Sequence, residues 1–144
     1  MADSATSERV FSERRKRPVE VQVELASELG SPARARHALD IFSDWLPHGA
    51  FCDLRVIVTE LVTNGVKYGP GGPIDVNVAL QPGGRLRGEV DDGGLGGVRI
   101  RPPGPAGGGL GLVIVDALVA SWGVRAGSSH VWFELDATWN AATA

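Results

Sequence analysis

The sequence predicts one α+β domain, a two-layer sandwich in which a mainly antiparallel sheet is covered on one face by three helices. Three observations support this fold class. The 144 residues, 43% of them apolar, suffice for one hydrophobic core but not for two. The apolar pattern switches along the chain between strict alternation and helical spacing. The order of these patterns is strand, two helices, hairpin, glycine-rich loop, helix and hairpin.

The strands are predicted from alternation of apolar and polar residues. The first is 19–25, with the sequence VEVQVEL, which is typical of a strand with one buried face. The same alternation recurs in four further segments, which form two predicted hairpins: 74–80 with 86–90, and 122–126 with 131–135. Glycine-containing turns separate the members of each pair, so each pair is expected to be antiparallel.

Three helices are predicted from apolar spacing and from their ends. The first starts at Ser31-Pro32 and runs to a stop at Pro47, with apolar residues Ala38, Leu39, Phe42, Trp45 and Leu46. The second is expected from near Asp53 to Tyr68 and is ended by Gly69-Pro70. The third covers 110–119, an almost wholly apolar run whose length favours a buried helix.

The two ends of the chain differ from the rest. Residues 1–18 are polar and include the basic run Arg14-Arg15-Lys16-Arg17, so we expect a disordered tail there, with a partner contact as the alternative. A folded domain is expected over 19–136 and a C-terminal tail over 137–144. The sequence contains neither a signal-peptide core nor an apolar run long enough to span a membrane. We therefore expect a cytoplasmic protein without membrane contact.

Charge and cysteine content exclude several classes. With 14 Lys and Arg against 17 Asp and Glu, the net charge of −3 argues against direct nucleic-acid binding. The single cysteine, Cys52, cannot form an intramolecular disulfide, and no Cys/His spacing of a zinc site occurs. The three histidines, His37, His48 and His130, have no evident partners, so ordinary surface or structural roles are expected.

A polar face on the second predicted helix could carry chemistry. At about 100° per residue, Glu60, Asn64 and Lys67 fall within one narrow wedge. Glu60 and Asn64, at i and i+4, could place a general base beside an amide that binds magnesium. Taken alone, the pair is better described as a solvated helix face.

A second pattern is a carboxylate followed by glycines at a strand end. Asp91 and Asp92 precede a Gly-Gly-Leu-Gly-Gly run, and such a carboxylate can accept a hydrogen bond from an exocyclic amine. The other interpretation is an ordinary Asp-Gly turn. Asp92 is the better candidate because it continues the alternation of Leu86, Gly88 and Val90, so the choice depends on strand register.

The third pattern is a loop rich in glycine ahead of an apolar helix. Eight of the 17 residues from Gly93 to Gly109 are glycine and three are proline. Gly107, Gly109 and Gly111 lie where free backbone N–H groups and a helix N-terminus could hold phosphate, although such loops are also simple linkers. Neither a P-loop nor a dinucleotide fingerprint is present.

Together and in this order, the three patterns resemble the ATP-binding domain of the gyrase, histidine-kinase and MutL superfamily, the Bergerat fold. The chain looks most similar to the bacterial anti-sigma factor serine kinases. The matching strings are ELVTNGVKYG at 60–69, DGGLG at 92–96 and GGGLGL at 107–112. The resemblance covers about residues 19–136, and it departs at Gly65, where the family usually has alanine.

The resemblance implies ATP and Mg²⁺ as cofactors and a role for each matching residue. Glu60 would be the catalytic base, Asn64 the magnesium ligand and Asp92 the adenine-reading carboxylate. Gly94 and Gly96 would shape the base pocket, and a lid over 97–108 would close on the triphosphate. The remaining nucleotide contacts would come from Lys67, Gly107, Gly109, Leu110 and Gly111.

The implied function is transfer of the γ-phosphate to a serine or threonine of an antagonist protein, together with sequestration of a sigma factor by a homodimer. A nucleotide-sensing interaction module without phosphotransfer is the alternative. Glu60 favours the kinase, because a module without chemistry would need no base at that position.

Overall fold

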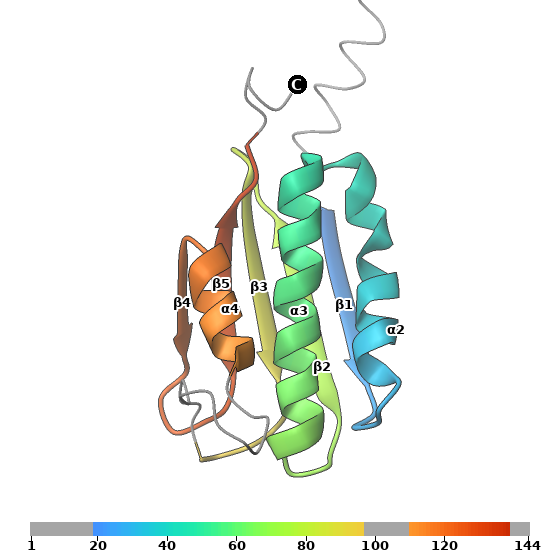
Figure 1. The fold of residues 1–144 in the computed structure, drawn as a ribbon, viewed down its shortest axis with the longest axis vertical. Coiled ribbons are helices and arrows are strands. Elements are labelled where there is room, and N and C mark those ends of the chain that lie inside the picture. Colours follow the sequence, from blue (N-terminus) through green and yellow to red (C-terminus); the bar gives the residue numbers. More distant parts are fainter. Residues whose placement is uncertain (1–18, 97–109, 139–144) are drawn as a thin grey trace, which may run out of the picture.

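The computed structural model of the chain describes residues 19–96 and 110–138. The predicted N-terminal tail, the predicted lid and the last six residues lie outside the described residues. The elements, drawn in Figure 1, are β1 (Val19–Leu25), α2 (Ser31–Ala38), the 3₁₀ helix η1 (Leu39–Asp44), α3 (His48–Tyr68), β2 (Ile74–Leu80), β3 (Arg85–Asp91), α4 (Leu110–Leu118), β4 (Ser121–Val124) and β5 (Val131–Asp136).

The five strands form one sheet in the order β1-β2-β3-β5-β4, and every neighbouring pair is antiparallel. Both predicted hairpins are present, as β2–β3 and β4–β5. β4 is shorter than predicted and ends at Val124, because the chain turns there: the Arg125 N–H donates to the His130 carbonyl, and Gly127 adopts a φ of +74°.

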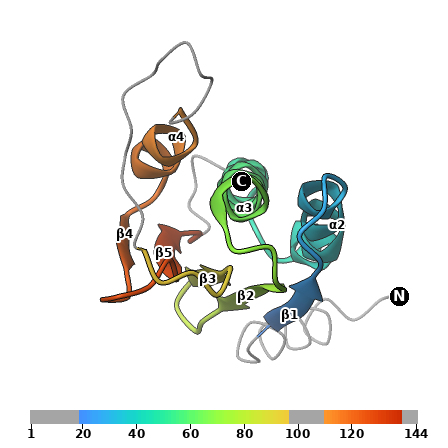
Figure 2. The same ribbon diagram turned by 90° about the horizontal axis from the view of Figure 1, so that it is seen from below.

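All the helices lie on one face of the sheet (Figure 2). The apolar side chains of that inner face and of the helices form one core, which includes the fully buried Phe42, Leu54, Ile57, Ile74 and Phe133. The predicted α+β two-layer architecture is therefore confirmed. Among the described helices, none combines the length and the apolar composition needed to cross a bilayer.

The first predicted helix is divided into two segments. α2 ends at Ala38, and the chain continues as η1. The reason lies in spacing, since Leu39, Phe42 and Trp45 recur every three residues, the repeat of a 3₁₀ helix rather than of an α-helix. Leu39 and Phe42 are both fully buried, so core packing favours the tighter winding.

The second helix is longer than predicted. α3 begins at His48, five residues before the predicted start near Asp53. Pro47, predicted as the stop of the preceding helix, serves as the N-cap of α3: its φ is −53°, its ψ is 146°, and its carbonyl accepts the Phe51 N–H at 3.0 Å. Because proline needs no hydrogen-bond donor at a helix start, it suits the last of the three residues, 45–47, that separate η1 from α3.

Candidate functional site

Glu60 and Asn64 meet the start of α4. Both side chains are partly buried on α3, and α4 packs beside that helix with Gly111 as its second residue. A Cβ at Gly111 would lie 2.8 Å from Glu60 Oε2 and 3.5 Å from both Asn64 side-chain heteroatoms. The glycine therefore allows the helix N-terminus to approach the carboxylate and the amide closely.

Asp92 is held at the end of β3 by a small hydrogen-bond network. Its Oδ1 accepts the Gly94 N–H at 2.8 Å and also the Ser129 hydroxyl. The Ser129 N–H in turn donates to the Gly94 carbonyl at 3.0 Å. A Cβ at Gly94 would collide with the Ser129 hydroxyl oxygen, so glycine is required there for Ser129 and Asp92 to meet.

The other carboxylate oxygen of Asp92 faces the C-terminal turn of α3. A Cβ at Gly69 would lie 2.9 Å from Asp92 Oδ2, and a Cβ at Gly65 would lie 3.3 Å from Asp92 Cβ. Gly65 stands where the kinases that the chain resembles usually have alanine. The methyl group of an alanine at this position would also lie 3.1 Å from Ile74 Cδ1, so α3 already packs tightly on the sheet without it.

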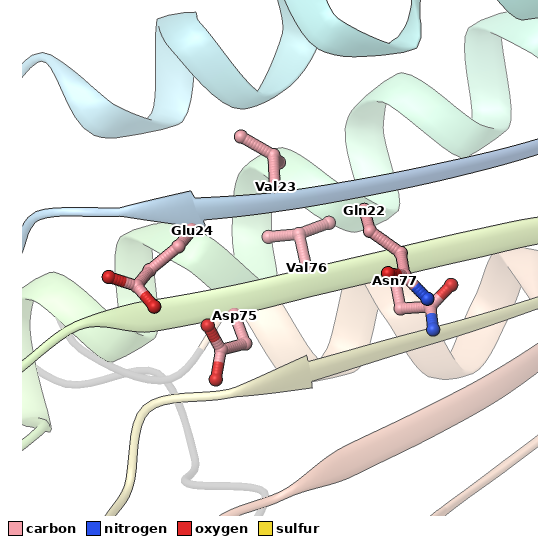
Figure 3. A pocket seen from close by; sticks show the side chains of 6 residues that line it. All are labelled: Gln22, Val23, Glu24, Asp75, Val76 and Asn77. Carbon is pink, nitrogen blue, oxygen red and sulfur yellow. The ribbon is translucent and has the colours of Figure 1, made fainter.

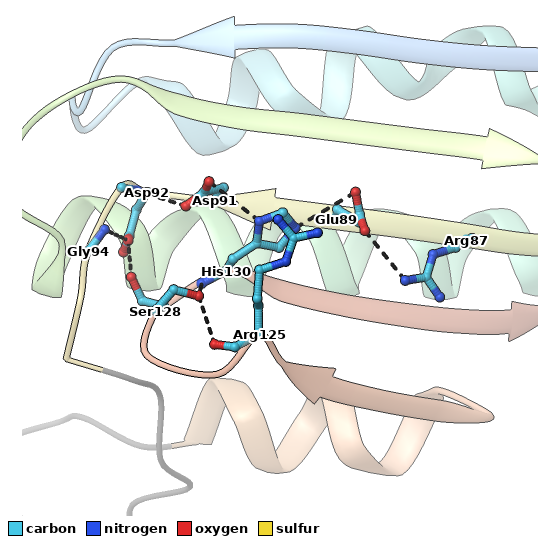
Figure 4. A network of polar contacts seen from close by, with 10 residues as sticks. Arg87, Glu89, Asp91, Asp92, Gly94, Arg125, Ser128 and His130 are labelled. Carbon is cyan, nitrogen blue, oxygen red and sulfur yellow. Dashed lines mark hydrogen bonds and ion pairs between the residues drawn. The ribbon is translucent and has the colours of Figure 1, made fainter.

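Asp91 and Asp92 lie on opposite faces of the sheet. Asp91 Oδ1 accepts the Gly93 N–H at 2.9 Å, and its Oδ2 lies 3.4 Å from His130 Nδ1 (Figure 4). His130 Nε2 lies 3.7 Å from Glu89 Oε2. The register thus places Asp92, as predicted, on the side of the helices. It also gives His130, for which the sequence indicated no partner, two acidic neighbours on the outer face.

Several predicted site residues are not brought into this arrangement. Gly96 is exposed, and a Cβ there would meet nothing within 4 Å. The side chain of Lys67 is exposed in the last turn of α3 and has no hydrogen bond or ion pair with any described residue. Gly107 and Gly109 lie outside the described residues. Leu110 is the first residue of α4.

Ser129 and Gly69 are site residues that sequence reasoning missed. Ser129 is separated from Asp92 by 37 positions, and its contact depends on the pairing of β3 with β5. Its neighbour Ser128 is of the same type but turns away, donating to the Arg125 carbonyl. No local pattern distinguishes the two serines. Gly69 was interpreted only as a helix stop.

Residues 52–138 match the family described as histidine kinase-, DNA gyrase B-, and HSP90-like ATPase. This span is more than half of the chain and contains every described residue of the site. The chain belongs to this ATPase family. Membership of this family implies that the chain binds ATP.

A comparison with solved structures supports the same fold. The crystal structure of the RsbU and RsbW domains of Rv1364c from Mycobacterium tuberculosis matches with a TM-score of 0.61 at 21% identity. The match covers 81% of this chain and 31% of that chain, so this ATPase domain corresponds to less than a third of the matched protein. A search of curated proteins gave no match.

Proposed function

We propose that this ATPase-family chain is a protein serine/threonine kinase that phosphorylates an antagonist protein and, as a homodimer, sequesters a sigma factor. The observation that carries the proposal is the meeting of Glu60, Asn64 and Gly111 at the N-terminus of α4. A carboxylate, an amide and a helix N-terminus are the groups needed to accept a proton and to hold phosphate.

The adenine end of the site is proposed at Asp92. Its Oδ1 already accepts two hydrogen bonds from Gly94 and Ser129, which orients the carboxylate. Its Oδ2 is then the acceptor for the exocyclic amino group of the base. Gly94 and Gly96 would border the base.

The triphosphate end is proposed at the start of α4. The first N–H groups of a helix lack partners within the helix, and the helix dipole favours negative charge there. Gly107, Gly109, Leu110 and Gly111 would supply these N–H groups. Lys67, one turn beyond Asn64, would add a positive charge near the phosphates.

The donor set fits Mg²⁺ in the form in which proteins bind it together with a nucleotide. In the described ranges no group of three His, Cys, Asp or Glu residues could hold a metal alone. Mg²⁺ is commonly held by one or two protein oxygens plus phosphate oxygens and water. The Asn64 amide oxygen would be the protein ligand, and the ion would neutralise phosphate charge.

The proposed step assigns the chemistry to Glu60. Its carboxylate removes the proton from a serine or threonine hydroxyl of the substrate protein. The hydroxyl oxygen then forms a bond to the γ-phosphorus as the bond from that phosphorus to the β–γ bridging oxygen breaks, and ADP leaves. Partial burial of Glu60 beside α4 supports this role, because exclusion of water protects a reacting phosphoryl group.

Phosphotransfer from labelled ATP tests the proposal. The purified chain is incubated with γ-labelled ATP and fractionated proteins of its source cell. An acid-stable phosphoester on one small protein is expected, since phosphoserine and phosphothreonine survive acid and phosphohistidine does not. The variant Glu60→Ala should bind ATP with unchanged affinity but transfer no label.

A control variant, a second test variant and the outcome of the labelling experiment separate this function from its alternative. Thr63→Ala, on the same helix, should leave transfer unchanged. Asn64→Ala should remove the magnesium dependence of triphosphate binding, measured by calorimetry with and without Mg²⁺. If the chain binds ATP but no fraction is ever labelled, the kinase proposal is wrong and the chain is a nucleotide-sensing interaction module.

A further inference from the structure

The outer face of the sheet carries a groove remote from the candidate ATP site. It lies over β1 and β2, has a volume of about 310 Å³ and is lined by Gln22, Val23, Glu24, Asp75, Val76 and Asn77. Figure 3 shows the side chains of Gln22, Glu24, Asp75 and Asn77 on one side of the two strands. No described helix or strand covers this face (Figure 2). Its lining combines the two carboxylates of Glu24 and Asp75 with two amides and two valines.

Like charges are placed directly opposite each other beside this groove. Glu24 pairs with Asp75 across β1 and β2, and Asp75 pairs with Asp91 across β2 and β3. Carboxylates directly opposite each other on neighbouring strands repel and destabilise a sheet. The row therefore opposes folding unless positive charge compensates it.

The described part of the chain does not compensate the first half of this row. Within 19–96 and 110–138, the side chains of Glu24 and Asp75 take part in no hydrogen bond or ion pair. On the other half of the same face, by contrast, the acids are paired: Glu134 with Arg85 at 3.0 Å and with Arg87 at 3.2 Å. The positive charge that Glu24 and Asp75 lack is not found on the sheet.

A basic segment lies immediately before β1. Of the 14 Lys and Arg residues, five precede Val19, and four of these form the run Arg14-Arg15-Lys16-Arg17. Glu24 is five residues into β1 from Val19, about 17 Å along the strand. Arg14 is five residues before Val19, and an extended chain of that length also reaches about 17 Å. By folding back under β1, the run can reach Glu20 and Glu24.

We propose that residues 14–17 dock on the outer face of β1 and β2, with their cationic side chains against Glu20, Glu24 and Asp75. The docking is intramolecular, depends on charge and is independent of the proposed kinase activity. It also places the N-terminal segment against Asp75, whose partner on β3 is Asp91, the residue before Asp92.

Paramagnetic broadening of backbone amide signals in the full chain locates the segment. A spin label is attached to Ser12→Cys in a Cys52→Ser background, and ¹⁵N spectra are compared with the label oxidised and reduced. The amides of 22–24 and 75–77 should broaden, and the effect should fall at least threefold in 0.5 M NaCl or when the four basic residues are changed to alanine. Asp40→Asn with Asp44→Asn, on the helical side, is the matched control and should leave it unchanged.

The melting temperature gives a second and independent readout. Asp75→Asn relieves repulsion by Glu24 and Asp91 but also removes an attraction to the docked segment. The substitution should therefore raise the melting temperature when the basic run is changed to alanine, and lower it or leave it unchanged when the run is intact. An equal rise in both backgrounds would overturn the proposal.

Three further results would also overturn it. Broadening that is absent, or that appears on the helices, would mean that the segment does not occupy this face. Broadening of unlabelled ¹⁵N chains by labelled ¹⁴N chains in a mixed sample would mean that a second copy supplies the segment. Broadening that persists in 0.5 M NaCl would mean that charge does not hold it.

Discussion

The two faces of β3 use neighbouring residues for opposite purposes. On the inner face, Asp92 accepts hydrogen bonds from Gly94 and Ser129 and lies against the end of α3. On the outer face, Asp91 lies beside His130 in a half-buried charged layer. The residue types are the same, and only strand parity separates them. A carboxylate at a strand end thus acquires its role from the face to which it points.

On the inner face, glycines leave room for functional side chains, whereas on the outer face charged side chains form ion pairs. Gly65, Gly69, Gly94 and Gly111 each leave space that a functional side chain fills or approaches. On the outer face, Arg87 lies over the Trp132 ring at 5.0 Å and bridges Glu89 and Glu134. Inner-face substitutions should therefore affect nucleotide binding, and outer-face substitutions should affect mainly stability.

Replacement of each aspartate in turn by asparagine should give the largest difference in ATP affinity between two variants. Asp92→Asn should weaken ATP binding by about 1–3 kcal/mol, or fivefold to 150-fold in Kd, because one oxygen of a partly buried acceptor is replaced by an NH₂ donor. Asp91→Asn should change Kd less than about twofold. Calorimetric titration with ATP measures both, and equal effects would show that strand parity does not decide the adenine contact.

A methyl group at the end of α3 should act almost as strongly. Gly69→Ala places a Cβ 2.9 Å from Asp92 Oδ2 and against the Gly65 carbonyl, so the carboxylate or the helix end must move. ATP affinity should fall about tenfold, a loss of about 1.4 kcal/mol. Gly72→Ala is the control, because a Cβ there meets nothing within 4 Å, and unchanged affinity in both variants would refute the assignment.

Removal of one hydroxyl should have a smaller effect. Ser129→Ala removes the donor to Asp92 Oδ1, and we expect ATP binding to weaken by about 0.5–1.5 kcal/mol. Ser128→Ala removes the bond to the Arg125 carbonyl and should lower the melting temperature slightly while leaving Kd unchanged. The reverse ranking of the two variants in a titration would contradict the proposed role of Ser129.

The smallest expected effect concerns Asp136, also on the outer face. Hydrogen bonds from the Thr138 backbone and side chain lower the pKa of Asp136 below its ordinary value. A lowered folded-state pKa stabilises the fold above the unfolded pKa, and this stabilisation is lost as the pH falls through the folded pKa. In a ¹³C carboxyl titration, Thr138→Ala should raise the pKa of Asp136; an unchanged value would assign the shift to the backbone bond alone.

Most of the fold was predictable because it follows from short repeats. Alternation located all five strands, and apolar spacing located the three helices. The predicted helix boundaries are wrong where one residue or one spacing is compatible with two local structures. Pro47 was interpreted only as a stop, but it also caps α3, and the spacing of Leu39 and Phe42 fits a 3₁₀ turn as well as an α-helix. Element boundaries of this kind depend on packing against the core.

The site was predictable only in its local parts. Glu60 and Asn64 share a face because the helix repeat places them there, and the parity of Asp92 follows from Leu86, Gly88 and Val90. The contact of Ser129 with Asp92 and the approach of Gly111 to Glu60 join segments about 40 to 50 positions apart. No spacing rule covers such distances.

The sequence alone determined which residues share a helix face or a strand face, the order of the elements and the family resemblance, because these depend on periods of two and 3.6 residues and on motifs a few residues long. Only the tertiary structure decided which faces meet: that β5 pairs with β3 and brings Ser129 to Asp92, and that Glu24, Asp75 and Asp91 form one row of charge. The physical reason is that strand order and helix docking are set by burial of the whole apolar surface, a quantity that no local segment contains.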